Sequence, residues 1–212
     1  MDVLDRLDET RAQTDVLLHP FYQRWSAGSL SAAELAAYAG QYRHAVVALA
    51  DASQAAALQA QPAQREGLLA HAREERAHVQ LWDRFTEACG GALDATALEG
   101  TTQCVQAWTA GAGTLERLAV LYAVEAGQPE ISTTKLQGLR EHYQHVGEGP
   151  ATAYFELHAV RDVEHAAQAR TLIVELLAHA RDGAEQGRRM VARAQAALRG
   201  NWALLDGVQA LA

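Results

Sequence analysis

The segment FELHAVRDVEHA, at positions 155–166, holds the residues with the clearest capacity for chemistry in this chain. His158, Asp162 and His165 follow one another at spacings of four and three residues. In an α-helix, which turns by about 100° per residue, these side chains leave one face within an arc of about 60°. Two imidazoles and a carboxylate on one face suit a divalent first-row metal such as iron or manganese. A solvated, charged helix face is the alternative.

A second set of donors lies in the segment HAREERAHVQLW, at positions 71–82. Glu75 and His78 are neighbours at i and i+3, so both can reach one ion. Apolar residues follow His78 at helical spacing, which places it on the apolar side of the helix. His71 shares that face and is a rival ligand, and the neighbouring Glu74 is a further alternative to Glu75.

Glu125 ends the apolar run 118–124. An ionised carboxylate at the inner end of such a helix is costly unless it is paired or bound to a metal, although a side chain turned to solvent would avoid that cost. With this residue, three helices offer three carboxylates and three imidazoles, the ligand inventory of a dinuclear site in a helical bundle. The predicted metal ligands are Glu75, His78, Glu125, His158, Asp162 and His165.

The composition predicts that helices position these residues. Good helix formers dominate the 212 residues, and no window alternates with the period of a strand. Ser31 and Glu34 form a capping box, and each of the four prolines lies where a helix should start or break. We expect one all-α domain over residues 1–212, a bundle of seven to eight helices. The predicted helices are 2–18, 31–60, 62–89, 95–110, 114–126, 130–146, 151–181 and 184–199, with a short aromatic helical segment at 21–25 and a tail after Gly200.

Charge and hydropathy exclude other classes of protein. The formal net charge of −8 disfavours a nucleic-acid partner. The longest apolar runs are far shorter than the roughly 20 residues of a membrane span, and the charged N-terminus does not read as a secretory signal. Two cysteines, Cys89 and Cys104, cannot form a disulfide framework. We expect a cytoplasmic protein with a small-molecule or self-derived substrate.

Several stretches together resemble one known family. They are HPFYQRW near the start, ERAHVQLW in the middle, the segment 122–135 around Glu125, the His158–Asp162–His165 spacing, and NWALLDGV near the end. Over nearly the whole chain they resemble the haem-oxygenase-like dimetal oxidases and oxygenases, which share the fold of TenA and PqqC proteins. The resemblance implies a haem-oxygenase-like bundle, a non-haem Fe/Fe or Fe/Mn centre, O2 as co-substrate and a homodimer.

Within that family, Lys135 favours the para-aminobenzoate synthase branch, which includes the death-domain-associating protein. It lies ten residues after Glu125, where those proteins carry a lysine thought to supply nitrogen, and it is the only lysine beside 17 arginines. A composition so rich in arginine is expected to keep a primary amine where a guanidinium cannot serve. The resemblance makes Tyr22 the tyrosine that is consumed, and packing with Phe21 and Trp25 is its structural alternative. An external amino acid, amine or fatty acid is the other substrate that the family implies.

Three further classes compete with a dimetal enzyme. A haem protein would need an axial histidine near the N-terminus, and His19 could supply it. A thiaminase-like hydrolase would need Cys104 as a nucleophile, but no acid lies within four residues of it. A non-catalytic helical binding protein would leave the six predicted ligands scattered or facing solvent.

Overall fold

The computed structural model describes residues 2–211, and these residues form nine α-helices and two short 3-10 helices. The short aromatic segment after His19 folds as a helix of its own. The α-helices are α1 (Val3–Gln13), α2 (Pro20–Ser26), α3 (Ala32–Gln59), α4 (Pro62–Ala88), α5 (Glu99–Thr109), α6 (Thr114–Glu125), α7 (Gln128–His142), α8 (Ala153–Ala178) and α9 (Gly183–Gln209), and the 3-10 helices are η1 (Val16–Leu18) and η2 (Gly149–Ala151).

Local sequence signals set most of the helix starts. The predicted capping box before α3 is present: the Ser31 hydroxyl accepts from the Glu34 amide, and the Glu34 carboxylate accepts from the Ser31 amide. Pro20 and Pro62 occupy the first position of α2 and α4, where a missing N–H costs no helical hydrogen bond. The all-α prediction is confirmed over the described residues.

Several predicted boundaries are wrong: the helix predicted over 95–110 begins only at Glu99, and the helix predicted over 130–146 ends at His142. The two largest errors lie in the first and last helices. The first helix stops at Gln13 instead of continuing to residue 18, because Asp15 has an extended backbone and its side chain caps the separate helix η1. The last helix does not stop at Gly200 but continues to Gln209. Gly200 serves close packing instead of termination, since a Cβ there would lie only 3.0 Å from the Cα of Cys104 on α5.

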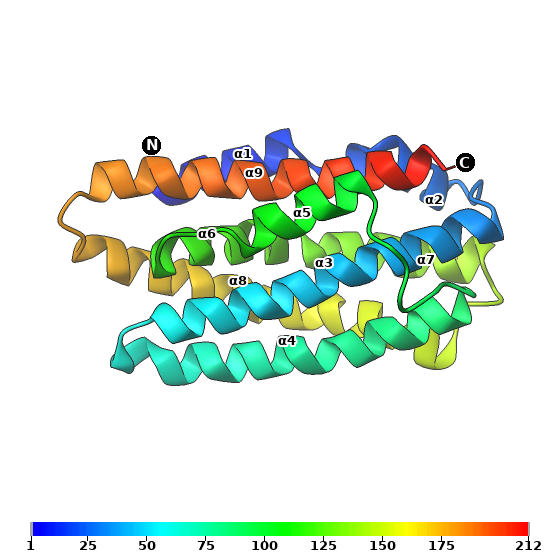
Figure 1. Ribbon diagram of the computed structural model, residues 1–212, viewed down its shortest axis with the longest axis horizontal. Helices are drawn as coiled ribbons and strands as arrows, with labels where there is room; N and C mark the ends of the chain where they lie inside the picture. The colour runs from blue at the N-terminus through cyan, green and yellow to red at the C-terminus, as the bar shows by residue number, and fades with distance from the viewer. Residues whose placement is uncertain (1, 212) are drawn as a thin grey trace.

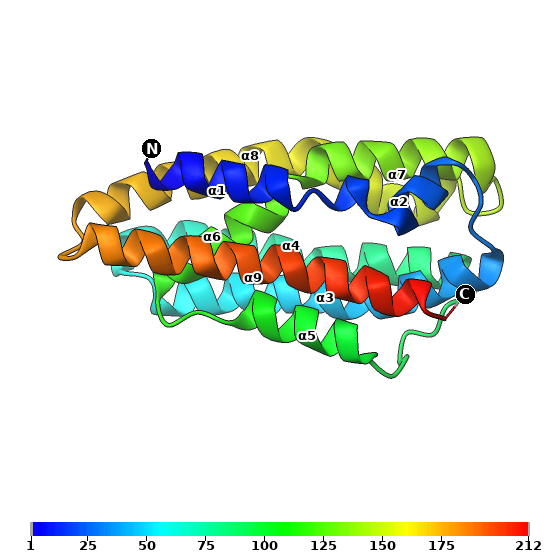
Figure 2. The same cartoon turned by 90° about the horizontal axis from the view of Figure 1, so that it is seen from above.

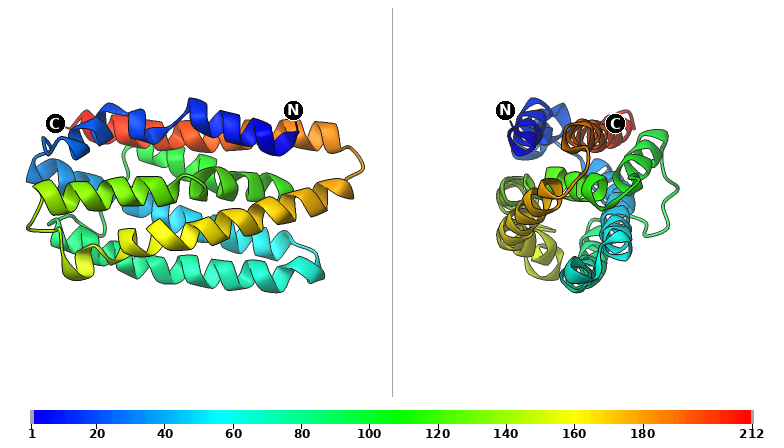
Figure 3. Two further views of the ribbon diagram at one scale, coloured as in Figure 1. Left: turned by 180° about the vertical axis from the view of Figure 1, so that it is seen from behind. Right: turned by 90° about the vertical axis from the view of Figure 1, so that its left-hand side faces the viewer.

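The long helices lie roughly along one axis of an elongated bundle (Figure 1). Helix α3 packs on α4, α7 on α8, and α9 on both α5 and α6. Seen from above, α1 and α2 follow one side of α9 while α5 lies on the other side (Figure 2). The view along the bundle shows α4 and α8 at its lower edge, below α9 (Figure 3). None of the helices over residues 2–211 combines the length and apolar character of a membrane span.

The buried apolar side chains form two clusters, and the two ends of α4 and of α8 belong to different clusters. On α4, Leu68 belongs to one cluster and Trp82 to the other; on α8, Ala169 and Phe155 divide in the same way. The segments between these residues, 71–78 and 158–165, carry the histidines and carboxylates singled out above. A polar layer therefore separates two hydrophobic cores.

Candidate metal centre

Three helices bring all six predicted ligands together in this polar layer. Helix α4 supplies Glu75 and His78, the last residue of α6 is Glu125, and α8 supplies His158, Asp162 and His165. All six are buried, with relative exposures of 0–6%. The periodicity argument holds for α8, because its three residues face inward together.

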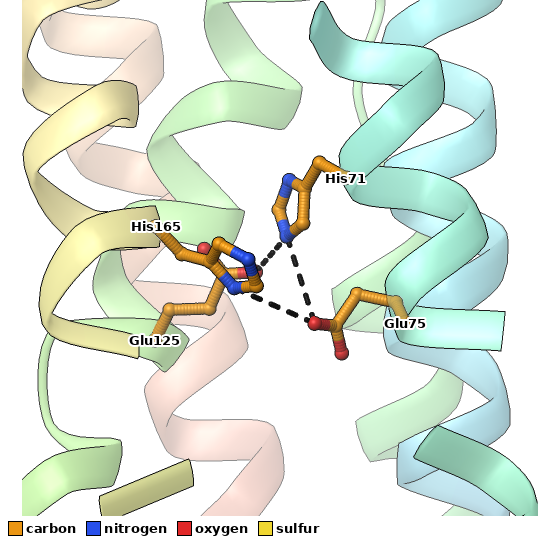
Figure 4. A group of neighbouring side chains, drawn as sticks. All are labelled: His71, Glu75, Glu125 and His165. Atoms are coloured by element: carbon orange, nitrogen blue, oxygen red, sulfur yellow. Dashed lines mark ion pairs between the residues drawn. The ribbon is translucent and has the colours of Figure 1, made fainter. Parts of the chain in front are cut away.

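The first group of donors consists of His71, Glu75, Glu125 and His165 (Figure 4). The Nε2 atom of His71 lies 2.9 Å from Oε1 of Glu125 and 3.7 Å from Oε1 of Glu75. The Nδ1 atom of His165 lies 3.6 Å from the same Glu75 oxygen. Two imidazole nitrogens and two carboxylates from three helices thus face one point.

A second group shares Glu75 with the first and adds His78 and His158. Nδ1 of His78 lies 3.2 Å from Oε1 of Glu75, and the rings of the two histidines have centroids 4.7 Å apart. Because one carboxylate belongs to both groups, the layer offers two adjacent positions for cations.

Asp162 lies between the two groups and contacts a histidine of each. Nδ1 of His158 donates to Oδ2 of Asp162 at 2.8 Å, which leaves Nε2 of that ring for the interior. The other carboxylate oxygen, Oδ1, lies 3.4 Å from Nδ1 of His165. The contact with His158 fixes the tautomer of a ring that could bind a metal.

The donor atoms fit divalent cations better than they fit one another. They approach closely but are oriented so that hydrogen bonds do not form, whereas buried polar atoms in proteins are nearly always hydrogen-bonded. Carboxylate oxygens and neutral imidazole nitrogens all present lone pairs, which iron and manganese accept. The atoms without a hydrogen-bond partner are Nε2 of His71 and His158, Nδ1 of His78 and His165, Oε1 of Glu75, Oδ1 of Asp162, and both Oε atoms of Glu125.

The same crowding shifts the pKa values of these groups. Burial raises the pKa of Glu125 above its usual range. Burial alone would lower the pKa of His71, but the nearby carboxylates, Glu125 foremost, raise it to about 11. Burial also opposes ionisation of Glu75, yet the imidazoles of His71 and His78 outweigh it and lower the pKa of that carboxyl. The buried carboxylates therefore require positive charge beside them.

Glu74 lies outside the group, although it was a rival of Glu75 in the sequence. Its carboxylate pairs with Arg161 on α8 through two hydrogen bonds of 2.8 Å each. Nε2 of His165 lies 3.2 Å from Oε2 of Glu74, at hydrogen-bond distance, while Nδ1 of the same ring faces the interior. Glu74 and Arg161 thus orient His165 from outside. His71, the other rival, lies inside the first group beside Glu75.

The two residues predicted to react, Tyr22 and Lys135, lie together away from the donor groups. The Lys135 side chain is 1% exposed, and its Nζ lies 5.1 Å from the centre of the Tyr22 ring. The Tyr22 hydroxyl lies 2.9 Å from that of Tyr38. Five aromatic rings within 4.7–5.8 Å surround the amine and form what we call the aromatic box: Tyr22, Tyr38, Tyr42, Trp82 and Phe155.

The aromatic box borders the second donor group. The Trp82 ring lies 4.8 Å from that of Tyr154, which in turn lies 4.1 Å from the imidazole of His158. Tyr154, Tyr38 and Tyr42 were not among the site residues predicted from the sequence. His71, which the sequence left as an alternative ligand, could have been preferred because it lies four residues before Glu75 and therefore on the same helix face.

The residues required by the competing classes are engaged elsewhere. Nδ1 of His19 accepts from the Phe21 amide at 3.0 Å, and Nε2 lies 3.1 Å from a carboxylate oxygen of Asp206, so neither nitrogen is free for haem. Cys104 is fully buried, and burial raises the pKa of its thiol, which disfavours the thiolate that a hydrolase needs.

Comparison with known proteins gives a consistent result. A family model described as iron-containing redox enzyme matches residues 36–202. The chain is 29% identical over 185 residues to a 4-aminobenzoate synthase of Chlamydia muridarum, covering 82% of this chain and 78% of the relative. It is 26% identical over 230 residues to a 4-aminobenzoate synthase of Nitrosomonas europaea, covering 96% and 89%.

Solved structures confirm the haem-oxygenase-like fold. A protein of that fold from Shewanella denitrificans superposes with a TM-score of 0.76 at 18% identity, covering 100% of this chain and 93% of the other. A TenA homologue from Pseudomonas syringae gives a TM-score of 0.78 at 15% identity, covering 98% and 91%. At these identities the likeness concerns the fold alone.

The sharing of Glu75 predicts how metal content changes on substitution. His71→Ala and His158→Ala each damage one group, so each variant should retain about half of the metal of the unaltered protein. Glu75→Gln damages both groups and should lose nearly all of it. Elemental analysis of protein purified without chelators measures this, with the exposed His145→Ala as control. Full metal content in the Glu75→Gln variant would contradict the shared-ligand arrangement.

The contact between Glu74 and His165 predicts that substitution of Glu74 weakens metal binding without abolishing it. Glu74→Ala should weaken metal binding by about 10–100-fold, the usual cost of losing a group that orients a ligand. Glu74→Gln keeps an oxygen acceptor for His165 and should recover part of the loss. Competition with a chelator gives the dissociation constants. Glu164→Ala is the matched control, because the Glu164 carboxylate pairs with Arg161 and, among the described residues, forms no hydrogen bond with the His165 ring. Equal losses in the two alanine variants would assign the effect to Arg161 alone.

Proposed function

Because the chain belongs to the family of iron-containing redox enzymes, we propose that it is an O2-activating dimetal oxidase that makes para-aminobenzoate from its own Tyr22 and Lys135. One observation carries the proposal: a buried lysine amine stands against the ring of a buried tyrosine, in an aromatic box that borders a double donor group. The names of the relatives, 4-aminobenzoate synthase, agree with this product.

The double donor group would hold the ions. His71, Glu75, Glu125 and His165 form one position, Glu75, His78 and His158 the other, and Asp162 lies between them. Nitrogen and oxygen donors suit both an Fe/Fe and an Fe/Mn pair. When bound, such a pair supplies the oxidising chemistry of O2.

Tyr22 has the carbon skeleton that the product requires. Its side chain is a six-membered ring with an oxygen and a one-carbon branch in para positions, and para-aminobenzoate has a nitrogen and a carboxyl carbon at the same places. The hydroxyl is held by Tyr38 at 2.9 Å, which fixes the orientation of the ring. Tyr22 is 1% exposed, so water is kept from the ring.

Lys135 is prepared to act as an amine instead of an ammonium ion. Burial lowers its pKa from 10.5 to about 7, because the aromatic box offers no carboxylate to balance a positive charge. A large fraction of the side chain is then uncharged near neutral pH and keeps a nucleophilic lone pair. An arginine could not do this, since its guanidinium stays charged.

A second candidate function is oxygenation of an external amino acid, amine or fatty acid. It is favoured by a cavity of about 670 Å³ whose wall includes His71 and His165. A non-catalytic binding role does not explain why the donor atoms converge. We expect a homodimer from the family resemblance.

The mass of the intact protein tests the proposal. After reaction with Fe(II), O2 and a reductant, the protein should lose mass at Tyr22 and at Lys135, and para-aminobenzoate should appear in equal amount. Tyr22→Phe should release none, whereas Tyr143→Phe, which changes a tyrosine outside the aromatic box, should behave like the unaltered protein. Unchanged mass together with turnover of an added amine or acid would favour the second function.

Stability provides a separate test of the Lys135 environment. Between pH 7 and 10.5 the unfolded chain binds a proton on this lysine that the folded chain does not, so this group makes the folded state more stable as pH rises. Lys135→Met removes the penalty and should stabilise the protein by roughly 1–4 kcal/mol below pH 7. The gain should shrink as pH approaches 10.5. Chemical denaturation across this range measures it, and a gain independent of pH would contradict the neutral amine.

A further inference from the structure

A cavity of about 670 Å³ opens between α4, α6 and α8 beside the candidate metal centre. Its wall includes His71 and His165 of the first donor group. The second group and the aromatic box, with Lys135 and Tyr22, do not contribute to it among the described residues. The metal centre would thus have two different sides. One side faces the aromatic box with the buried Lys135 amine, and the other faces the open cavity.

We propose that this cavity binds a small uncharged amphiphile, an aromatic or aliphatic body that carries a hydroxyl or amide group. The proposal rests on the proposed function in one respect, that the bound molecule would meet a metal centre. It adds the chemical class of the molecule and the side from which it arrives.

The lining determines this class. Leucines from three helices, among them Leu68, Leu121 and Leu172, form an apolar wall. Gln64 and Gln168 add amide groups that can donate to or accept from a polar end of the ligand. An apolar lining with a few polar groups is typical of small-molecule sites, and volumes of about 300–1,000 Å³ are usual for them.

Charge argues against a carboxylate ligand. Among the described residues that line the cavity there is no arginine or lysine, the side chains that hold carboxylates in pairs of hydrogen bonds. The two histidines of the lining, His71 and His165, already face the carboxylates of Glu125 and Glu75. Glu164 and Glu175 lie in the lining, and Glu175 forms no ion pair among the described residues. A cation gains little, because Glu164 is already paired with Arg161 and Glu175 is exposed to solvent. Amino acids, fatty acids and protonated amines therefore fit this cavity poorly. If the cavity serves the second candidate function, its external substrate is an uncharged molecule instead of one of these three.

Gly67 on α4 offers a way to close the cavity without disturbing the fold. It lies in the lining and is exposed, and a Cβ added there would meet nothing within 4 Å. Replacing a helical glycine by a larger residue also favours the helix. Ala70, one turn further along α4, is exposed and is not part of the lining, so Ala70→Trp is a matched control for Gly67→Trp.

The experiment uses two probes of the same size but different charge, 4-fluorobenzyl alcohol and 4-fluorobenzoate. Fluorine NMR titration of the protein as purified, and of the same protein after addition of Fe(II), gives their dissociation constants. We expect the alcohol to bind at least tenfold more tightly than the benzoate. Gly67→Trp should weaken binding of the alcohol at least tenfold, and Ala70→Trp should leave it unchanged.

Three results would overturn the proposal. They are no saturable binding of the alcohol, benzoate binding as tight as that of the alcohol, and alcohol binding that Gly67→Trp leaves intact. The metal content of each sample is measured in parallel. A protein that binds no metal would refute the proposed function, whereas the titration would still decide whether the cavity takes an uncharged ligand.

Discussion

The structure depends on how the helical bundle accommodates three carboxylates in its interior. Glu75, Glu125 and Asp162 are at most 2% exposed, and burying an ionised carboxylate without compensation costs several kcal/mol. Four imidazoles stand beside them, but most of the facing atoms form no hydrogen bonds. An arrangement that is unfavourable as a set of side chains alone becomes favourable when cations are held between them. If the donor layer holds cations, folding and metal binding are therefore parts of one equilibrium.

This requirement explains the architecture around the layer. Apolar clusters on both sides hold α4, α6 and α8 at fixed distances, so that the donors meet without being exposed to water. The bonds between Glu74 and Arg161 join α4 to α8 at the level of the donors. Elsewhere, close approach of α5 and α9 at Gly200 lets the last helix run the length of the bundle. Rigid helices, instead of loops, thus carry every member of the donor groups.

The sequence predicted the helices well because helix signals are local. Capping residues, prolines and apolar spacing act over a few positions, and the convergence of Glu75, Glu125 and His158 followed from which helix face is apolar. The features that the sequence did not predict depend on contacts between distant segments of the chain. Gly200 read as a helix end because its neighbour Cys104 lies almost a hundred positions earlier in the chain. The aromatic box was missed for the same reason, since tyrosines at 38 and 42 resemble ordinary core residues until Lys135 is placed among them.

The burial of Tyr22 affects how a product formed in the core would leave the protein. The ring lies on α2, a helix of seven residues that packs against α7, and its hydroxyl has no contact with bulk water. If Tyr22 is consumed as proposed, the fragment released from its ring would at first be enclosed by the protein. Its release would then require α2 to move or to unfold locally, and short elements near a chain end are among those that open at low free energy. Local opening of α2 would be needed only once in each protein molecule, because each molecule holds a single Tyr22.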